Sequence, residues 1–119
     1  MWKYAGLNSD GEWVIYDKNG EYKAGMDATD EDMYVVGNGL PKFTASWSNY
    51  LKYKNLDLSI YFRGAFGFEI FNIHEFYYGI PGMTSNVMKT AYTKNANIKE
   101  NPLVCDYFIE RGDYLKLDM

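Results

Sequence analysis

Hydrophobic and polar residues alternate along residues 56–66, in the stretch "LDLSIYFRGAF". The apolar positions are Leu56, Leu58, Ile60 and Phe62, and the polar positions between them are Asp57, Ser59, Tyr61 and Arg63. Successive side chains of a β-strand point to opposite faces of a sheet. This period of two therefore predicts a strand with one apolar and one hydrophilic face.

Two environments suit such a strand. Its apolar face packs on a protein core while water covers the other face, or its apolar face meets lipid while the polar face lines a hydrated barrel lumen. The stretch has 11 residues, which matches the roughly 9 to 11 of a tilted membrane strand better than the roughly 5 to 6 of a soluble one. The length favours a membrane strand, in which the four apolar residues face lipid and the four polar residues face the lumen.

A second alternation covers residues 43–53 and has the same length. Phe43, Ala45, Trp47, Leu51 and Tyr53 share one face, on which Asn49 is the only polar exception. Only Lys54 and Asn55 separate this stretch from Leu56. A two-residue connection is typical of a β-hairpin, so the two strands are predicted to pair antiparallel.

Shorter elements flank this hairpin. Residues 13–16 and 21–23 read as strands around a turn at 17–20, and Thr29 can cap a helical turn that ends at Asp32. The stretch "TSNVMKTAYTK" predicts one short surface helix, with Ser85 as its cap and Met88, Ala91 and Tyr92 at helical spacing. The next alternation, "YLKLD", occupies residues 114–118. The connection from residue 66 to this stretch is long, and a structureless connection of such length is uncommon in a compact soluble domain.

Composition narrows the possible classes of protein. Aromatic residues make up 18% of the 119 residues, and the net charge is -4. No cluster of Lys and Arg occurs, which argues against nucleic acid as a partner. No run of 18 or more apolar residues is present, so a transmembrane helix is excluded. The first residues also lack the pattern of a signal peptide, which indicates either a cytoplasmic protein or a beginning that lies upstream.

No catalytic, cofactor-binding or metal-binding motif is present. His74 is the only histidine and has no second His or Cys nearby to complete a zinc site. Cys105 is the only cysteine, which rules out an internal disulfide, and we expect it to be a packed thiol. The six aromatic residues in 66–83 suit a membrane-interface girdle, a ligand-facing rim or a hydrophobic core equally well.

Three stretches carry a family resemblance over nearly the whole chain. They are "YAGLN", the segment from "ATDEDMYVVGNGLPK" to "YKNLDLSIYFRGAFGFEIFN", and "DYFIERGDYLKLDM". In this order they resemble the C-terminal barrel region of SusC/RagA-type TonB-dependent outer-membrane transporters. The resemblance implies an all-β fold of antiparallel strands, as part of a transmembrane β-barrel with long extracellular loops and one short loop helix.

The resemblance also implies an organisation and a set of partners. Residues 1–42 would form an extracellular loop with a hairpin, 43–66 a membrane hairpin, 67–105 a second extracellular loop and 106–119 the start of the next strand. Such transporters import glycans or peptides together with a SusD-like surface lipoprotein, and they contact TonB through an N-terminal region. That region and the plug precede the matched part, so we expect these residues to be a fragment that is not transport-competent alone.

A soluble, aromatic-rich carbohydrate-binding β module is the alternative. It predicts about seven short strands with regular turns, whereas this sequence predicts two long strands and a large gap. The two hypotheses also differ in exposure. A membrane strand predicts that Leu58, Ile60 and Phe62 are unusually exposed, whereas a soluble module predicts that all three are buried. The exposed strands further predict that the chain is insoluble without detergent.

Overall fold

The computed structural model describes residues 1–82 and 86–118, and the chain divides into two compact units. We call Met1–Val36 with Phe71–Ile109 the loop unit, and Gly37–Ile70 with Glu110–Met119 the hairpin unit. The described structure consists mainly of antiparallel strands with one α-helix, which confirms the predicted all-β class. No helix among the described residues is long and apolar enough to cross a membrane.

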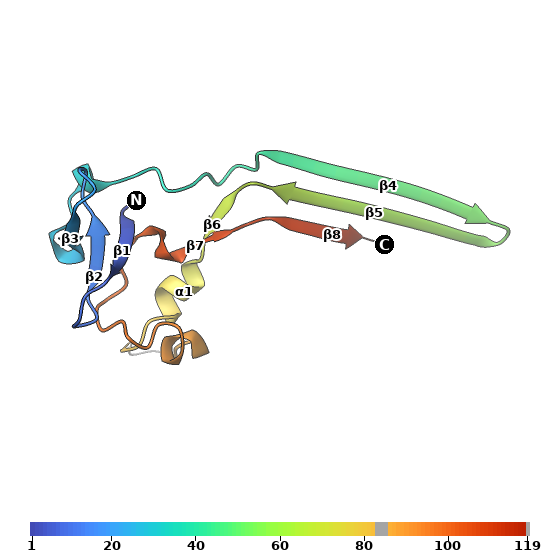
Figure 1. Ribbon diagram of the computed structural model, residues 1–119. Helices are drawn as coiled ribbons and strands as arrows, with labels where there is room; N and C mark the ends of the chain where they lie inside the picture. Colours follow the sequence, from blue (N-terminus) through green and yellow to red (C-terminus); the bar gives the residue numbers. More distant parts are fainter. Residues whose placement is uncertain (83–85, 119) are drawn as a thin grey trace. The chain divides into compact units, whose positions relative to one another are not determined.

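The hairpin unit is built on a three-stranded antiparallel sheet. Strands β4 (Phe43–Tyr53) and β5 (Leu56–Phe66) have 11 residues each and pair around Lys54 and Asn55, as the sequence predicted. Strand β8 (Tyr114–Asp118) pairs antiparallel with the other edge of β5, so the order is β4-β5-β8 (Figure 1). A tight turn joins β4 to β5, whereas a long connection that includes β6, α1 and β7 separates β5 from β8.

The loop unit contains a second three-stranded sheet. Strand β2 (Trp13–Tyr16) lies between β1 (Lys3–Leu7) and β3 (Tyr22–Ala24), and all pairs are antiparallel. The β2–β3 hairpin confirms the predicted strand, turn and return, with the return shifted by one residue. Strand β1 was not predicted from the sequence.

The two turns of this sheet have the same construction. Asn8 Oδ1 accepts hydrogen bonds from the backbone N–H groups of Asp10 and Glu12 at 3.0 and 2.9 Å. Asp17 Oδ1 accepts them from Asn19 and Glu21 at 2.8 and 2.9 Å. The fourth residue of each turn is a glycine, Gly11 or Gly20, with φ of 83° and 84°. Side chains of Asn and Asp stabilise turns in this way, and glycine adopts positive φ at little cost.

Short helical elements also occur in the loop unit. The helix α1 spans Ile73–Tyr78, and 3₁₀ helices occupy Gly25–Asp27, Asp30–Asp32, Lys89–Tyr92 and Asp106–Phe108. The predicted surface helix near Met88 and Tyr92 is thus a single 3₁₀ turn, and its proposed cap, Ser85, lies outside the described residues. The helix α1 was not predicted from the sequence. The chain passes between the units along the short paired strands β6 (Glu69–Phe71) and β7 (Ile109–Arg111).

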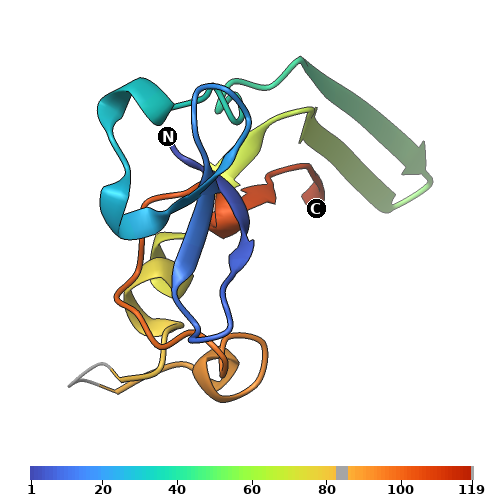
Figure 2. The same ribbon diagram turned by 60° about the vertical axis from the view of Figure 1, so that its left-hand side comes forward.

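Aromatic side chains dominate the core of the loop unit. The core contains the buried residues Trp13, Ile80, Ile98, Cys105 and Phe108. Phe71 and Phe76 pack against it, with ring centroids 6.1 and 5.3 Å from that of Phe108. Figure 2 shows the elements that contribute to this core: the first strands (blue), the helix (yellow) and the segment that follows it (orange to red). The aromatic residues near position 71 are therefore partly core residues, while Tyr77 and Tyr78 of α1 are exposed.

Candidate functional site: a two-faced sheet

The register of β4, β5 and β8 places apolar side chains on one face of the sheet. Trp47 lies opposite Phe62, Leu51 opposite Leu58, and Phe62 is also opposite Leu117 of β8. The face is completed by Phe43, Ala45, Tyr53, Leu56, Ile60, Phe66 and Leu115, with Asn49 as its polar exception. We call this the apolar face. It contains all four residues of the predicted lipid-facing set.

Aromatic rings stack in pairs on the apolar face. The ring centroids are 5.1 Å apart for Phe43 and Phe66 and 5.6 Å apart for Trp47 and Phe62, with interplanar angles of 22° and 10°. Gly64 makes the first pair possible, because a Cβ at this position would come within 2.7 Å of the Phe66 ring. Cross-strand aromatic pairs stabilise a sheet. Among the described residues of the hairpin unit, no second layer of structure packs on these pairs.

The exposure of this face agrees with a membrane strand more than with a soluble core. Trp47 is 58% exposed and Leu58 is 40% exposed. Ile60 and Phe62 are half-buried under their neighbours on the sheet. The prediction of unusual exposure is therefore confirmed for Leu58 and only partly met for the other two. None of the three lies in a closed core, whereas the soluble alternative requires all three to be buried in one.

The opposite face is hydrophilic and contains Asp57, Ser59, Tyr61 and Arg63, all of them exposed. We call this the polar face. Near the turn, Lys52 Nζ lies 3.9 Å from Asp57 Oδ1. Farther along β5, Arg63 Nε lies 3.0 Å from Asp118 Oδ2 of β8. The alternation of one strand thus extends over three strands, and the ion pairs of the sheet all lie on this face.

Strand β8 contributes residues that the sequence analysis did not assign to either face. Leu115 and Leu117 join the apolar face, while Tyr114, Lys116 and Asp118 join the polar face. The alternation of "YLKLD" was recognised, but its pairing partner was not, because a single strand does not define its neighbour. The pairing with β5 fixes the faces.

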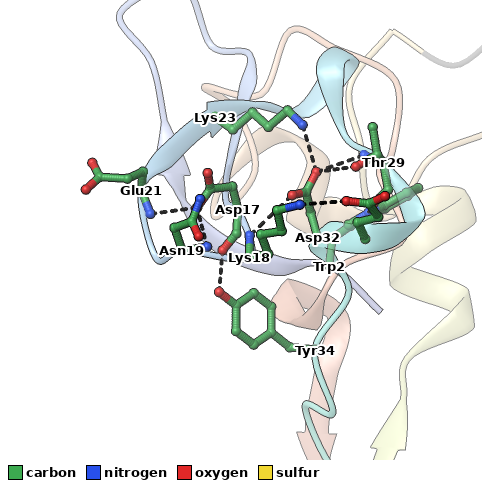
Figure 3. Close-up of polar contacts among 10 residues, drawn as sticks. Trp2, Asp17, Lys18, Asn19, Glu21, Lys23, Thr29, Asp32 and Tyr34 are labelled. Atoms are coloured by element: carbon green, nitrogen blue, oxygen red, sulfur yellow. Dashed lines mark hydrogen bonds and ion pairs between the residues drawn. The ribbon is translucent and has the colours of Figure 1, made fainter.

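Several polar groups of the loop unit form hydrogen bonds with Asp32, which is buried (Figure 3). Its carboxylate accepts hydrogen bonds from Lys23 Nζ and Thr29 Oγ1, both at 2.7 Å, and from the backbone N–H groups of Thr29 and Lys18. These donors, Lys23 first among them, hold the pKa of Asp32 well below its usual range. In turn, Asp32 raises the pKa of Lys23. The bonds between Thr29 and Asp32 confirm the predicted cap.

A second buried network joins α1 to the following segment. Glu75 Oε1 accepts hydrogen bonds from Asn95 Nδ2 at 3.2 Å and from Lys94 Nζ at 3.1 Å. Asn95 is fully buried, donates to Gly79 O at 2.7 Å and accepts from the Tyr107 hydroxyl at 2.6 Å. A buried carboxylate with these partners is structural, since each partner satisfies it within the fold.

The candidate chemical groups occupy positions typical of structural residues. Cys105 is fully buried, and its burial raises the pKa of the thiol to about 11, so it is protonated and protected at neutral pH. His74 lies exposed on α1. No group of three or more His, Cys, Asp or Glu side chains among the described residues is arranged to hold a metal ion.

The chain is similar to two TonB-dependent receptors of Formosa agariphila. It is 28% identical to TonB-dependent receptor P3 over 114 residues, which cover 85% of this chain and 11% of the receptor. It is 43% identical to TonB-dependent receptor P26 over 58 residues, which cover 49% of this chain and 6% of that receptor. The matched residues therefore span only 11% and 6% of the length of these curated relatives.

No family model matches the sequence. No solved structure matches it either. The similarity to the two receptors agrees at the family level with the resemblance identified from the sequence.

Proposed function

Because the chain is a relative of the TonB-dependent receptors, we propose that it forms part of the β-barrel of an outer-membrane transporter. In this proposal β4, β5 and β8 are consecutive barrel strands. The apolar face, with Leu56, Leu58, Ile60 and Phe62, meets lipid. The polar face, with Asp57, Ser59, Tyr61 and Arg63, lines the lumen.

One observation supports this proposal most strongly. The sheet exposes an apolar face on one side and has charged side chains on the other. Strands of 11 residues extend about 35 Å. At the usual tilt they cover the roughly 25 Å apolar band of an outer-membrane barrel. Phe43 and Phe66 lie at one end of this band and Tyr53 at the other, as in the aromatic girdles that flank such bands.

The connections of the sheet support an orientation. Outer-membrane barrels have short periplasmic turns and long extracellular loops. We assign the turn at Lys54 and Asn55 to the periplasmic side, and the loop unit, which contains most of residues 1–42 and 67–105, to the cell surface. The hairpin 43–66 spans the membrane, and residues 106–119 lead into the next strand.

The substrate and partners of the proposed transporter come from the family resemblance. We propose import of a glycan or peptide by a SusC/RagA-type receptor, together with a SusD-like surface lipoprotein and with energy delivered by TonB. The role is that of a transporter, not of an enzyme. The charged and aromatic surfaces of the loop unit offer contacts for cargo or lipoprotein.

The topology can be tested by epitope insertion in the full-length receptor that contains this chain. One variant carries the epitope at Asn19, in the turn between β2 and β3, and the other carries it between Lys54 and Asn55. The proposal predicts that antibody labels the first variant on intact cells and the second only after the outer membrane is opened. Labelling of both on intact cells, or recovery of the protein in the soluble fraction, would contradict it.

A further inference from the structure

Two cations on the polar face share one carboxylate. Arg63 of β5 and Lys116 of β8 lie directly opposite each other in the register. Asp118 forms an ion pair with each of them: its Oδ2 lies 3.0 Å from Arg63 Nε, and its Oδ1 lies 3.1 Å from Lys116 Nζ. Like charges directly opposite in a sheet destabilise it unless an anion compensates them. One carboxylate compensates only one of the two cations.

Tyrosines flank these cations on the same face. Tyr61 is two residues from Arg63 along β5, and it pairs with Asp118. Tyr114 is two residues from Lys116 along β8, and it pairs with Ala65. Tyr61 is 40% exposed and Tyr114 is 49% exposed. Ser46 of β4 lies opposite Arg63 and adds a hydroxyl to the row. We call Ser46, Tyr61, Arg63, Tyr114 and Lys116 the cationic patch.

The rest of the polar face differs from this patch. The other cation of the face, Lys52, lies opposite Asp57 and pairs with its carboxylate. Positive charge is therefore in excess only at the end of the sheet away from the tight turn. The side chains of Arg63 and Lys116 are about half exposed there and available to a ligand.

We propose that the cationic patch binds an acidic group of the cargo, a carboxylate or sulfate on a glycan. The assignment rests on the proposed function, in which this face lines the lumen. An anion near Arg63 and Lys116 gains charge-assisted hydrogen bonds, which the planar guanidinium forms well with carboxylate and sulfate oxygens. The exposed tyrosines supply flat surfaces and hydroxyls beside it. Asp118 then limits the affinity by occupying the cations when no ligand is bound.

Binding to the purified full-length receptor tests this inference. The probes are an oligogalacturonate against its methyl ester, and a carrageenan oligosaccharide against its desulfated form, measured by calorimetry at low salt. We expect the receptor to bind at least one acidic probe more tightly than its neutral counterpart. The pair that shows the difference identifies the acidic group as carboxylate or sulfate.

Three substitutions locate the site. Arg63→Gln and Lys116→Gln should each weaken the acidic probe about tenfold, because each removes one charge-assisted contact. The matched control Lys52→Gln, on the same face, should leave the affinity unchanged. Asp118→Asn should tighten binding, since it removes the competing carboxylate. A purely structural role of the three charges predicts no tightening.

The outcomes separate this inference from the proposed function. Heat-modifiable migration on gels shows first whether each receptor variant forms a barrel. A folded receptor that binds neither acidic probe, or that binds them equally well after Arg63→Gln and Lys116→Gln, overturns the inference and leaves the transporter proposal standing. A wild-type chain that never forms part of a barrel overturns both.

Discussion

Two tryptophans illustrate how the units differ. Trp13 in the loop unit is 1% exposed and packs among aromatic rings, whereas Trp47 in the hairpin unit stacks on Phe62 and is 58% exposed. The loop unit contains eleven Asp and Glu against six Lys, and the hairpin unit five against six Lys and Arg. The first unit excludes water from its own core and has an acidic surface. The second presents apolar side chains that only a different medium or another chain can cover.

The loop unit should depend on its core most strongly. Trp13→Ala leaves a cavity and an unpaired Asn101 carbonyl, to which the indole N–H donates at 2.8 Å, and should cost about 3 to 5 kcal/mol. Cys105 is buried in the wild type. In the Trp13→Ala variant we expect it to react with iodoacetamide, which mass spectrometry of the full-length receptor measures. Met26→Ala, at an exposed residue of the same unit, is the control. Continued protection of Cys105 in Trp13→Ala would show that the core is not the source of stability.

The hairpin unit should depend on the solvent that each face meets. Ile60→Arg places a cation on the apolar face and should cost about 2 to 4 kcal/mol near the bilayer midplane. Ser59→Arg and Arg63→Ala alter the polar face, where water solvates a charge, and should leave folding largely intact. The measurement is urea unfolding of the receptor in liposomes, with heat-modifiable gel migration as a second readout. Equal damage from all three, or greater damage from Arg63→Ala, would contradict the assignment of faces.

Acid should weaken the loop unit by protonating Asp32. The pKa of Asp32 is lowered in the folded state by Lys23 and Thr29. Its stabilisation is therefore present above the unfolded value of about 3.9 and declines as pH falls from there through the lower folded pKa. Limited proteolysis of the loop unit from about pH 6 to about pH 3 should show this loss in the wild type. Asp32→Asn should be less stable near neutral pH and less sensitive to acid. Asp30→Asn, at an exposed residue, should behave as the wild type.

The smallest effect is expected at the tight turn of the hairpin unit. Lys54 has φ of 52°, a conformation that costs a residue with a Cβ more than it costs glycine. Lys54→Gly should therefore stabilise the hairpin by about 0.5 to 1 kcal/mol. Asn55→Gly, at the next residue, which lacks a positive φ, should destabilise it instead. Urea unfolding distinguishes the two, and a destabilising Lys54→Gly would contradict the strained geometry of the turn.

The long strands were predictable because each carries its own signal. Alternation over residues 43–53 and 56–66, broken only at Asn49, predicts the antiparallel pairing around the two residues between them. The structure confirms this pairing from Phe43–Phe66 to Tyr53–Leu56. The polar and apolar faces follow from the same period. Local patterns also identified the turn at Asp17 and the cap at Thr29.

Elements that depend on distant contacts were not predictable in the same way. Strand β1 joins a sheet through β2, and the pairing of β8 with β5 bridges a long connection. The helix α1 was missed because its aromatic residues were interpreted only as a membrane-interface girdle, a ligand-facing rim or a hydrophobic core, with no secondary structure assigned to them. A local signal existed, since Asn72 followed three residues later by Glu75 is a helix start, and Asn72 Oδ1 accepts from the Glu75 N–H at 3.0 Å. The cationic patch requires β8 beside β5, so sequence alone did not reveal it.

The assignment of lipid to the apolar face can be measured at two adjacent residues. Leu58→Cys and Ser59→Cys, each in the full-length receptor and labelled with an environment-sensitive fluorophore, differ only in the face to which they belong. In liposomes that contain brominated lipids, we predict strong quenching of the label at Leu58 and little at Ser59, while an aqueous quencher shows the reverse order. Equal quenching of both labels by brominated lipids, or stronger quenching at Ser59, would contradict the lipid-facing assignment.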